Sequence, residues 1–229
     1  MPAHNVEAYV EEAIRSVLSQ RGVSSELLVA DDASTDVTWD RIRAYRDNPR
    51  LRFWRFRKRH GPGATRNYLM DRAQGVYLSF CDADDVMLPG HLRAMVRALN
   101  HDPGAGVVYT DRLIRNRSGK LHRSCRSRGP AETWDLFEGP ISNGGTLVRR
   151  TLIRKLGGYR TDLPILEDYD LFWKLSEVTR FIYLRGKPLY FYRKRPGSLS
   201  SQSKRKHSLI QRGLLRGVIL RRYGFRVPW

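Results

Sequence analysis

Three carboxylates lie within four consecutive positions, at Asp82, Asp84 and Asp85, and follow an apolar run at residues 76–81. The run is rich in β-branched and aromatic side chains, which is typical of a strand buried on both faces. Ligands of open α/β sheets bind at the carboxyl ends of the strands. Because crowded carboxylates repel one another, a divalent cation such as Mg²⁺ or Mn²⁺ would reduce that repulsion. The pattern therefore predicts a cation site, with solvated acids at a strand end as the alternative.

Two other segments place polar groups beside the ends of expected elements. Asp31 and Asp32 follow an expected strand at residues 26–30, where they either bind a ligand or cap the next helix. The loop at residues 61–67 brings backbone amides and Arg66 to the start of a helix. Such a helix start with a guanidinium beside it suits a phosphate.

A further acidic group opens a short expected helix at residues 167–175, with carboxylates at Glu167, Asp168 and Asp170. If this helix packs against the edge of the sheet, one of its carboxylates faces the cation site across a cleft. We therefore expect acidic side chains from separate segments to meet in one cleft.

The elements that must position these groups alternate between helix and strand. Helices are predicted at residues 6–20, 37–45, 64–73, 89–100, ahead of 157–158 and at 167–175, and strands at 26–30, 51–56, 76–81, 107–113, 141–148 and 180–193, with an exposed hairpin at 115–128. This alternation predicts an α/β fold with a doubly wound, mostly parallel sheet flanked by helices. The chain opens at the turn that would follow a first strand. We therefore expect that strand to be absent or truncated, with either an upstream start or a short edge formed by the first residues.

Length and charge bound the class of protein. The 229 residues are predicted to form one domain at 1–200 and a basic C-terminal helix or tail at 201–229. The net charge of +19 favours polyanionic partners. No run of 18 apolar residues occurs, and early glutamates interrupt the start, so we expect neither a membrane span nor a signal peptide and predict a cytoplasmic protein. The two cysteines are expected to be reduced.

The C-terminal region concentrates positive charge. Beyond Glu177 the chain has no acidic residue, and 14 of its last 52 residues are Lys or Arg. Apolar residues at helical spacing predict a helix at 203–223. One hypothesis is a peripheral helix that docks on anionic lipid at the inner face of a membrane. The alternative, which we favour because Arg221 interrupts the apolar stripe, is a helix that packs on the domain.

Taken together, the segments resemble family 2 glycosyltransferases, the inverting group with the GT-A fold. The matching pieces stand in the family's order at residues 2–5, 16–20, 31–36, 61–67, 82–85, 157–159 and 167–170, so the resemblance covers the chain to about residue 200. Each piece is a weak signal alone, whereas their common order is specific. The resemblance implies a metal-dependent hexosyltransferase whose DXD motif is residues 82–84.

The resemblance also implies how the nucleotide sugar is bound. The residues implied in donor binding are Pro2, His4, Glu7, Asp32, Arg66, Asp82 and Asp84. Asp32 resembles the carboxylate that binds the donor's base, on which the ring of His4 would pack. Asp82 resembles the residue that holds the ribose hydroxyls. Asp84 resembles the ligand of an Mg²⁺ or Mn²⁺ ion that bridges the diphosphate, and Arg66 is implied at the ribose or phosphate.

Two further positions concern the reaction itself. Asp168 resembles the general base that deprotonates the acceptor hydroxyl, with Glu167 as the alternative. Many family members carry a histidine shortly after the last strand, within reach of the metal or diphosphate, and Arg195 stands at that place here. Because arginine cannot ligate a cation but can pair with phosphate, Arg195 is a candidate phosphate contact. The second protein ligand of the metal is therefore left open.

The leading hypothesis is an inverting glycosyltransferase that moves a sugar from a nucleoside-diphosphate donor, expected to be a UDP-sugar, to an acceptor hydroxyl. A saccharide or lipid-linked acceptor is expected, in cell-surface polysaccharide or glycolipid assembly. One alternative is a basic nucleic-acid-binding module, although no recognised nucleic-acid motif is present. Another is an inactive glycosyltransferase-like protein. Trp39, Trp134 and Trp173 either line an acceptor site or belong to the core.

Overall fold

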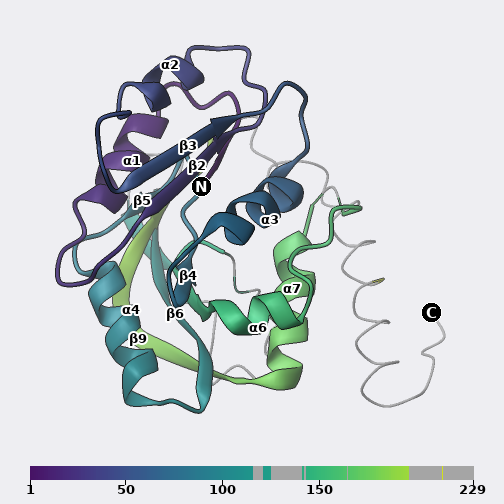
Figure 1. The fold of residues 1–229 in the computed structure, drawn as a ribbon. Coiled ribbons are helices and arrows are strands. Elements are labelled where there is room, and N and C mark those ends of the chain that lie inside the picture. Colours follow the sequence, from purple (N-terminus) through teal and green to yellow (C-terminus); the bar gives the residue numbers. More distant parts are fainter. Residues whose placement is uncertain (116–120, 125–140, 142, 164, 196–212, 214–229) are drawn as a thin grey trace.

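A computed structural model describes residues 1–115, 121–124, 141, 143–163, 165–195 and 213 (Figure 1). In chain order its elements are β1 (Pro2–Ala3), α1 (Val10–Leu18), β2 (Leu27–Asp31), α2 (Thr38–Arg43), β3 (Leu51–Arg55), α3 (Pro62–Arg72), β4 (Tyr77–Ser79), β5 (Val86–Met87), α4 (His91–His101), β6 (Ala105–Arg115), β7 (Leu121–Ser124), β8 (Thr146–Arg149), α6 (Arg150–Lys155), α7 (Glu167–Val178) and β9 (Arg180–Tyr192). The predicted alternation of helices and strands is confirmed. Within the described part of the chain, every helix is too short or too polar to cross a bilayer.

The first sheet is parallel and has the order β1-β2-β3. The predicted truncated first strand is present as two residues, with Pro2 paired to Ala30 and Ala3 to Asp31. The amino group of Met1 extends the pairing by donating to the carbonyl oxygen of Leu28 at 2.8 Å. These contacts give β2 a hydrogen-bonded neighbour on both sides, so its buried backbone groups are satisfied.

Strand β2 is buried along its whole length because helices cover both faces of the first sheet (Figure 1). Its alternate residues enter two different cores, as the period of two requires. Leu28 and Ala30 pack with Leu69 of α3, whereas Val29 packs with Ile14 of α1 on the opposite face. This doubly wound arrangement carries Asp31, at the end of β2, and Asp32 beyond it to the edge of the sheet.

The second sheet is mixed, with the order β4-β8-β6-β9-β5 and β7 paired to β6. Only β6 and β9 pair in parallel among its named strands, while β4 with β8, β6 with β8, β5 with β9 and β6 with β7 are antiparallel. The expectation of a mostly parallel sheet therefore holds for β1–β3 and is wrong for this sheet. For β6 and β7 the physical reason is that they follow one another without a described helix between them, so the chain reverses as a hairpin instead of crossing over.

The strand ahead of the acidic residues differs from its prediction. It is three residues long, Tyr77–Ser79, with only Leu78 fully buried, and it lies at the end of the strand order. Val76 is 69% exposed. Phe80 and Cys81 are buried beyond the strand, and Phe80 forms a parallel bridge with Gly144. The apolar character of this segment therefore reflects packing of the strand's continuation, not burial of both faces of a central strand.

Several predicted boundaries also shift. The helix expected from residue 6 begins at Val10, after Asn5 takes a left-handed conformation, and the backbone amide of Val6 binds the hydroxyl of Thr38 at 2.9 Å. The helix expected from Pro89 begins at His91, after Gly90 takes a left-handed conformation. The hairpin expected at 115–128 is confirmed where β7 pairs with β6, and its other residues lie outside the described part. So do Trp134, Cys125 and the C-terminal helix at 203–223, apart from Gly213.

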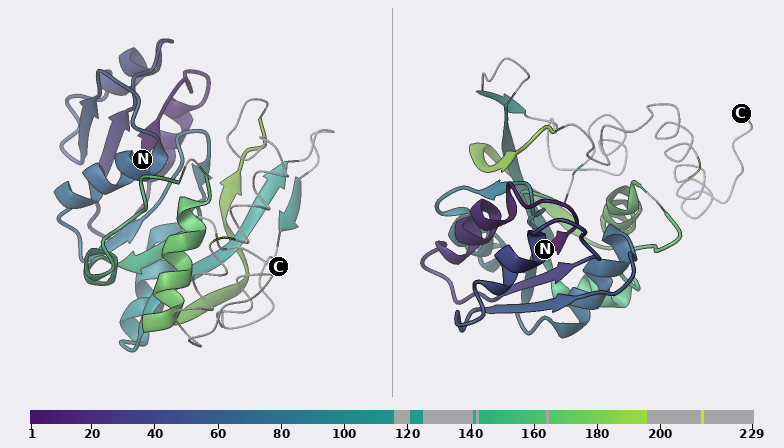
Figure 2. Two further views of the ribbon diagram at one scale, coloured as in Figure 1. Left: turned by 90° about the vertical axis from the view of Figure 1, so that its right-hand side faces the viewer. Right: turned by 90° about the horizontal axis from the view of Figure 1, so that it is seen from above.

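The second sheet is also covered on both faces. Met95 and Leu99 of α4 pack with Val108 and Leu147 on one side. Helices α6 and α7 cover the other side (Figure 2).

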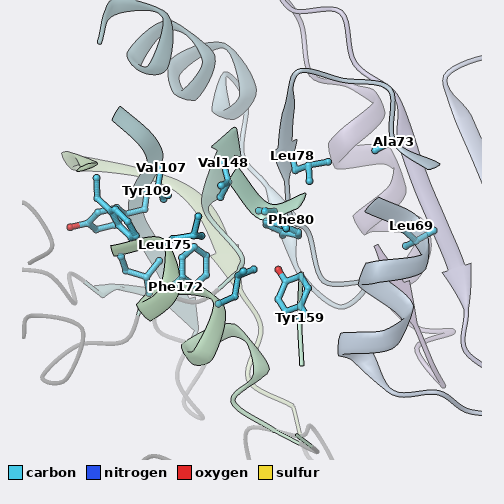
Figure 3. Close-up of a cluster of buried hydrophobic side chains, with 14 of the residues drawn as sticks. Leu69, Ala73, Leu78, Phe80, Val107, Tyr109, Val148, Tyr159, Phe172 and Leu175 are labelled. Atoms are coloured by element: carbon cyan, nitrogen blue, oxygen red, sulfur yellow. The ribbon is translucent and has the colours of Figure 1, made fainter. Parts of the chain in front are cut away.

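The core on the α6 and α7 side also includes residues of α3. Figure 3 shows this larger cluster, in which Phe172 and Leu175 of α7 lie with Val107 and Tyr109 of β6, and Leu69 of α3 contributes from the first sheet's layer. One hydrophobic core therefore ties α3 and α7 to the sheets.

Gly144 gives a direct test of this packing. An added Cβ there would lie 2.7 Å from the hydroxyl oxygen of Tyr190 and closer still to two carbons of its ring. Since Tyr190 is fully buried, its ring has no room to move aside. We expect Gly144→Ala to lower the free energy of unfolding by about 1–3 kcal/mol, measured by chemical denaturation. Gly213→Ala, whose added Cβ would meet nothing within 4 Å at a helical position, should not lower the free energy of unfolding, and an equal loss of stability in the two variants would contradict the assignment.

Candidate active site

Arg66 joins three segments that are distant in the sequence. This residue of α3 is 7% exposed, and its Nη2 donates to Asp82 Oδ1 at 2.8 Å while its Nη1 donates to Glu167 Oε1 at 2.5 Å. Its guanidinium carbon also lies 5.5 Å from the centre of the Tyr159 ring. The two carboxylates raise the pKa of Arg66 despite its burial. The predicted convergence of the loop after β4 with the starts of α3 and α7 is therefore present in the structure.

Asp168 lies beside this cluster at the start of α7 and is partly exposed. Its Oδ1 accepts a hydrogen bond from the Tyr169 backbone amide at 3.0 Å. Burial of the carboxylate, followed by repulsion from Glu167, raises the pKa of Asp168 to about 7, while Arg66 acts in the opposite direction. A carboxylate with such a pKa can accept a proton near neutral pH.

Glu167 differs from its neighbour in environment. Its side chain is only 8% exposed and forms the ion pair with Arg66 described above. Glu167 therefore orients Arg66, whereas no ion pair engages Asp168 among the residues that the structure describes. Of the two carboxylates that the sequence proposes as the base, Asp168 is the one whose surroundings favour proton transfer.

Asp85 belongs to a separate buried network. It is 2% exposed, and its carboxylate accepts hydrogen bonds from the Tyr190 hydroxyl at 2.9 Å and from the Arg193 backbone amide at 2.8 Å. The Tyr190 hydroxyl in turn accepts the backbone amide of Asp82 at 3.1 Å. Burial, with Asp82 and Asp84 nearby, raises the pKa of Asp85 well above its usual range. Asp85 therefore fastens the acidic loop to β9, a structural role that the grouping of three acids in the sequence did not reveal.

Asp84 is paired with the residue that replaces the expected histidine. Arg195 Nε donates to Asp84 Oδ2 at 2.5 Å, and the side chains are 21% and 18% exposed, respectively. Arg193 Nε donates to the backbone oxygen of Asp84 at 2.9 Å. Burial and the neighbouring charge of Asp82 raise the pKa of Asp84, and the hydrogen bond from Arg195 acts against this increase.

Asp32 holds the loop that leads into α3. Its Oδ1 accepts the backbone amide of His60 at 2.7 Å and its Oδ2 accepts that of Gly61 at 2.8 Å, and the residue is 3% exposed. The ring of His4 contacts the backbone oxygen of Asp32 through Nδ1 at 2.8 Å. Pro2 lies in β1, two positions before His4 in the sequence. Asp32 thus links the first sheet to the helix that carries Arg66.

Glu7 lies in a different setting from the other predicted donor residues. It is exposed, and its carboxylate accepts the backbone amide of Val37 at 3.1 Å, just before α2. The structure does not bring Glu7 into the contacts around Arg66 within the described chain. Trp173, a candidate acceptor platform, is 1% exposed and belongs to the core, and Trp39 packs edge-on against Phe53 at 5.5 Å.

Tyr159 is a site residue to which the sequence assigned no role. Its hydroxyl donates to Asn143 Oδ1 at 2.5 Å, and its backbone amide and oxygen both bind the side chain of Asn67 at 2.8–2.9 Å. A Cβ on Gly158 would lie 2.6 Å from Asn67 Oδ1, and the φ of Gly158 is +74°. The only sequence signal for Tyr159 was the motif at residues 157–159. In this motif Gly158 leaves room for Asn67 of α3 to approach the backbone.

The acids fit a cation that is shared with a substrate. No group of three or more His, Cys, Asp or Glu side chains in the described ranges could hold a metal by itself. However, Mg²⁺ and Mn²⁺ commonly use one or two carboxylates together with phosphate oxygens. Asp84, crowded by Asp82 and largely buried, supplies such a carboxylate. The residues present therefore fit a divalent cation completed by a diphosphate.

Known structures share this architecture. The first 349 residues of TarS from S. aureus, solved in complex with UDP-GlcNAc, align with a TM-score of 0.80 and 22% identity over 96% of this chain and 65% of that chain. A mannosyltransferase from Pyrobaculum calidifontis, in complex with GDP-Man and Mn²⁺, aligns with a TM-score of 0.65 and 22% identity over 99% of this chain and 64% of that one. These likenesses confirm the predicted GT-A fold.

Curated relatives extend beyond the length of this chain. An uncharacterised protein of Mycobacterium tuberculosis is 32% identical over 191 residues, which are 76% of this chain and 59% of the relative. The hyaluronan synthase of Pasteurella multocida is 27% identical over 185 residues, 80% of this chain and 19% of that protein. The chain therefore spans between a fifth and three fifths of the length of these two relatives.

A family model provides the last piece of evidence. The model described as glycosyl transferase family 2 matches residues 1–157, which include β1, the acidic loop after β4 and all of α3. This match covers more than half of the 229 residues. With the shared fold and the convergence of Arg66, Asp82 and Glu167, it shows that this chain belongs to glycosyl transferase family 2.

Proposed function

We propose that this chain transfers a sugar from a nucleoside-diphosphate donor to an acceptor hydroxyl, with inversion at the anomeric carbon. The observation that carries the proposal is the meeting of three segments at Arg66, with a carboxylate of pKa about 7, Asp168, beside it. A proton acceptor next to paired acidic and basic groups is the combination that this transfer needs. Membership of the family supports the same reaction.

The residues divide the work between the donor and the acceptor. Asp32 would accept a hydrogen bond from the base, beside the ring of His4, and Asp82 would bind the ribose hydroxyls. Arg66 would lie at the ribose or phosphate while it keeps Asp82 in place. Of the other predicted donor residues, Pro2 is supported by its position in β1 beside His4, whereas Glu7 stays a prediction without a supporting contact.

Asp168 would act at the acceptor. It takes the proton of the acceptor hydroxyl as the oxygen of that hydroxyl forms a bond to the anomeric carbon. The bond from that carbon to the diphosphate oxygen breaks, and its electron pair leaves with the nucleoside diphosphate. Asp84 would hold a divalent cation, Mg²⁺ or Mn²⁺, and such a cation when bound neutralises charge on the leaving diphosphate.

We propose a UDP-sugar as the donor and a saccharide or lipid-linked hydroxyl as the acceptor, in the assembly of a surface polysaccharide or glycolipid. UDP-GlcNAc in the TarS structure and the synthase name of the Pasteurella relative support these classes. GDP-Man in the other structure makes a GDP-sugar the second donor to test. Release of the nucleoside diphosphate from a panel of UDP- and GDP-sugars would identify the donor. No release from any of them would favour an inactive protein instead.

Asp168→Asn tests the base. The variant keeps the size of the side chain but cannot accept the proton, so we expect transfer to fall by about 10²–10⁴-fold while donor affinity stays unchanged. In the unmodified protein, kcat/KM should rise with pH up to about 7 and level off above it, because the raised pKa keeps Asp168 protonated at lower pH. Near-normal turnover of the variant would exclude Asp168 as the base.

The same variant has a readout that does not depend on activity. Because the pKa of Asp168 is raised in the folded protein, the folded state binds more protons than the unfolded state between about pH 4 and pH 7. Its contribution to stability therefore declines as the pH rises through this window. We expect Asp168→Asn to raise the Tm at pH 8 relative to the unmodified protein and to change it little at pH 4.

Asp84→Asn tests the metal ligand. The amide has no negative charge to offer a cation, so we expect the dependence of UDP binding on Mn²⁺ to disappear, measured by isothermal titration calorimetry. Asp71→Asn is a suitable control, because Asp71 belongs to α3 and forms no ion pair among the described residues. If Asp84→Asn binds UDP in Mn²⁺ as tightly as the unmodified protein does, the assignment of the ligand is wrong.

A further inference from the structure

Each acidic side chain of the loop after β4 has its own ion-pair or hydrogen-bond partner in the structure. Asp82 is paired with Arg66, and Asp85 is held by Tyr190 and the backbone of Arg193. Asp84 is the remaining one, and its carboxylate is paired with Arg195. The predicted metal ligand therefore already carries a positive charge from the protein itself.

The contact between Asp84 and Arg195 is shielded from water. The two side chains are 18% and 21% exposed, and the atoms that meet are 2.5 Å apart. An ion pair with so little exposure is screened less than one on the surface. A cation that approaches Asp84 must therefore displace this arginine or share the carboxylate with it.

Arg193, the neighbouring arginine, does not pair with the Asp84 carboxylate, because its guanidinium has other partners. Its Nη2 pairs with Glu12 at 2.6 Å and its Nε binds the backbone oxygen of Asp84. These contacts hold the end of β9 in place beside the acidic loop. Arg195, two residues further on, is thus brought to the Asp84 carboxylate by a fixed backbone.

The guanidinium of Arg195 also keeps most of its donors for another partner. Arginine has five N–H groups, and the contact with Asp84 uses the one on Nε. Among the described residues, the other contact recorded for this group is the Tyr9 ring, whose centre lies 6.0 Å away. The Nη groups can therefore bind an anion in the fork geometry that suits phosphate.

We propose that Arg195 is an exchangeable counter-ion that occupies Asp84 in the donor-free protein and moves to the diphosphate when nucleotide and divalent cation bind together. This inference rests on the proposed function, since it assumes a nucleoside diphosphate at Asp84. It assigns Arg195 a regulatory task beyond a phosphate contact. A cation alone competes with Arg195 and binds weakly, whereas the nucleotide removes the competitor. The two ligands therefore bind with positive coupling, which by linkage is equal in both directions.

The experiment is a titration of Mn²⁺ followed by its electron paramagnetic resonance signal, which reports binding without any turnover. It is run without nucleotide and with saturating UDP, and in parallel with GDP. For the unmodified protein we expect the nucleotide to tighten Mn²⁺ binding by at least about fivefold, the lower end of typical coupling between two ligands. For Arg195→Gln we expect tighter binding of Mn²⁺ alone and a coupling that is reduced by a similar factor.

Lys194→Gln is the matched control, because it removes the same charge from the neighbouring residue. Lys194 is exposed and forms no ion pair in the described part of the structure. We expect its Mn²⁺ affinity and coupling to equal those of the unmodified protein. Arg195→Lys, which retains a charge without the fork, should restore the competition with Mn²⁺ alone but not the full coupling.

The outcomes distinguish failure of the proposed exchange from failure of the proposed function. If Arg195→Gln binds Mn²⁺ alone no more tightly than the unmodified protein does, or if Lys194→Gln has the same effect, the exchange is wrong while the proposed function stands. If the unmodified protein binds neither nucleotide with or without Mn²⁺, the proposed function fails and the exchange fails with it. Thermal melting of each variant confirms that the comparison is made on folded protein.

Discussion

The ion pairs of Arg66 are the interaction on which the site depends. A guanidinium buried this deeply needs an acidic partner, because a charge without compensation in the protein interior is costly, and Arg66 takes its two partners from two different segments. Arg66 is therefore a geometric constraint on the loop after β4 and on the start of α7. It holds Asp82 and Glu167 within reach of one another, although 85 residues separate them in the sequence.

Strand β9 provides the second constraint. Tyr190 on this strand binds both Asp82 and Asp85, and the residues after it deliver Arg193 and Arg195 to the acidic loop. The loop is consequently held from two directions, by α3 on one side and by β9 on the other. Its three carboxylates differ in environment as a result. Asp82 is paired with Arg66, Asp85 is buried in a hydrogen-bonded network with Tyr190, and Asp84 is paired with Arg195.

The raised pKa of Asp168 illustrates how the site trades stability for reactivity. A carboxylate placed against buried neighbours is harder to ionise, and at neutral pH this lowers the stability of the folded protein. The same effect gives Asp168 the proton affinity that its proposed role as the base requires. Glu167, one residue away, is instead held in an ion pair with Arg66. Neighbouring residues of one helix thus have different environments because of their contacts.

The alternation of helices and strands and the segments that carry the acids could be predicted from the sequence alone, because the periodicity of apolar residues is a local property of the chain. The GT-A fold and the family were indicated by the resemblance in the order of the motifs. The sequence also placed Arg66, Asp82 and Glu167 in segments that the structure brings into contact. It could not assign the directions of the strands in the second sheet, the role of Asp85, the part of Tyr159 or the pairing of Asp84 with Arg195. Those features were decided by the tertiary structure, since burial and contacts between distant segments set each charge's partner and hence its chemistry.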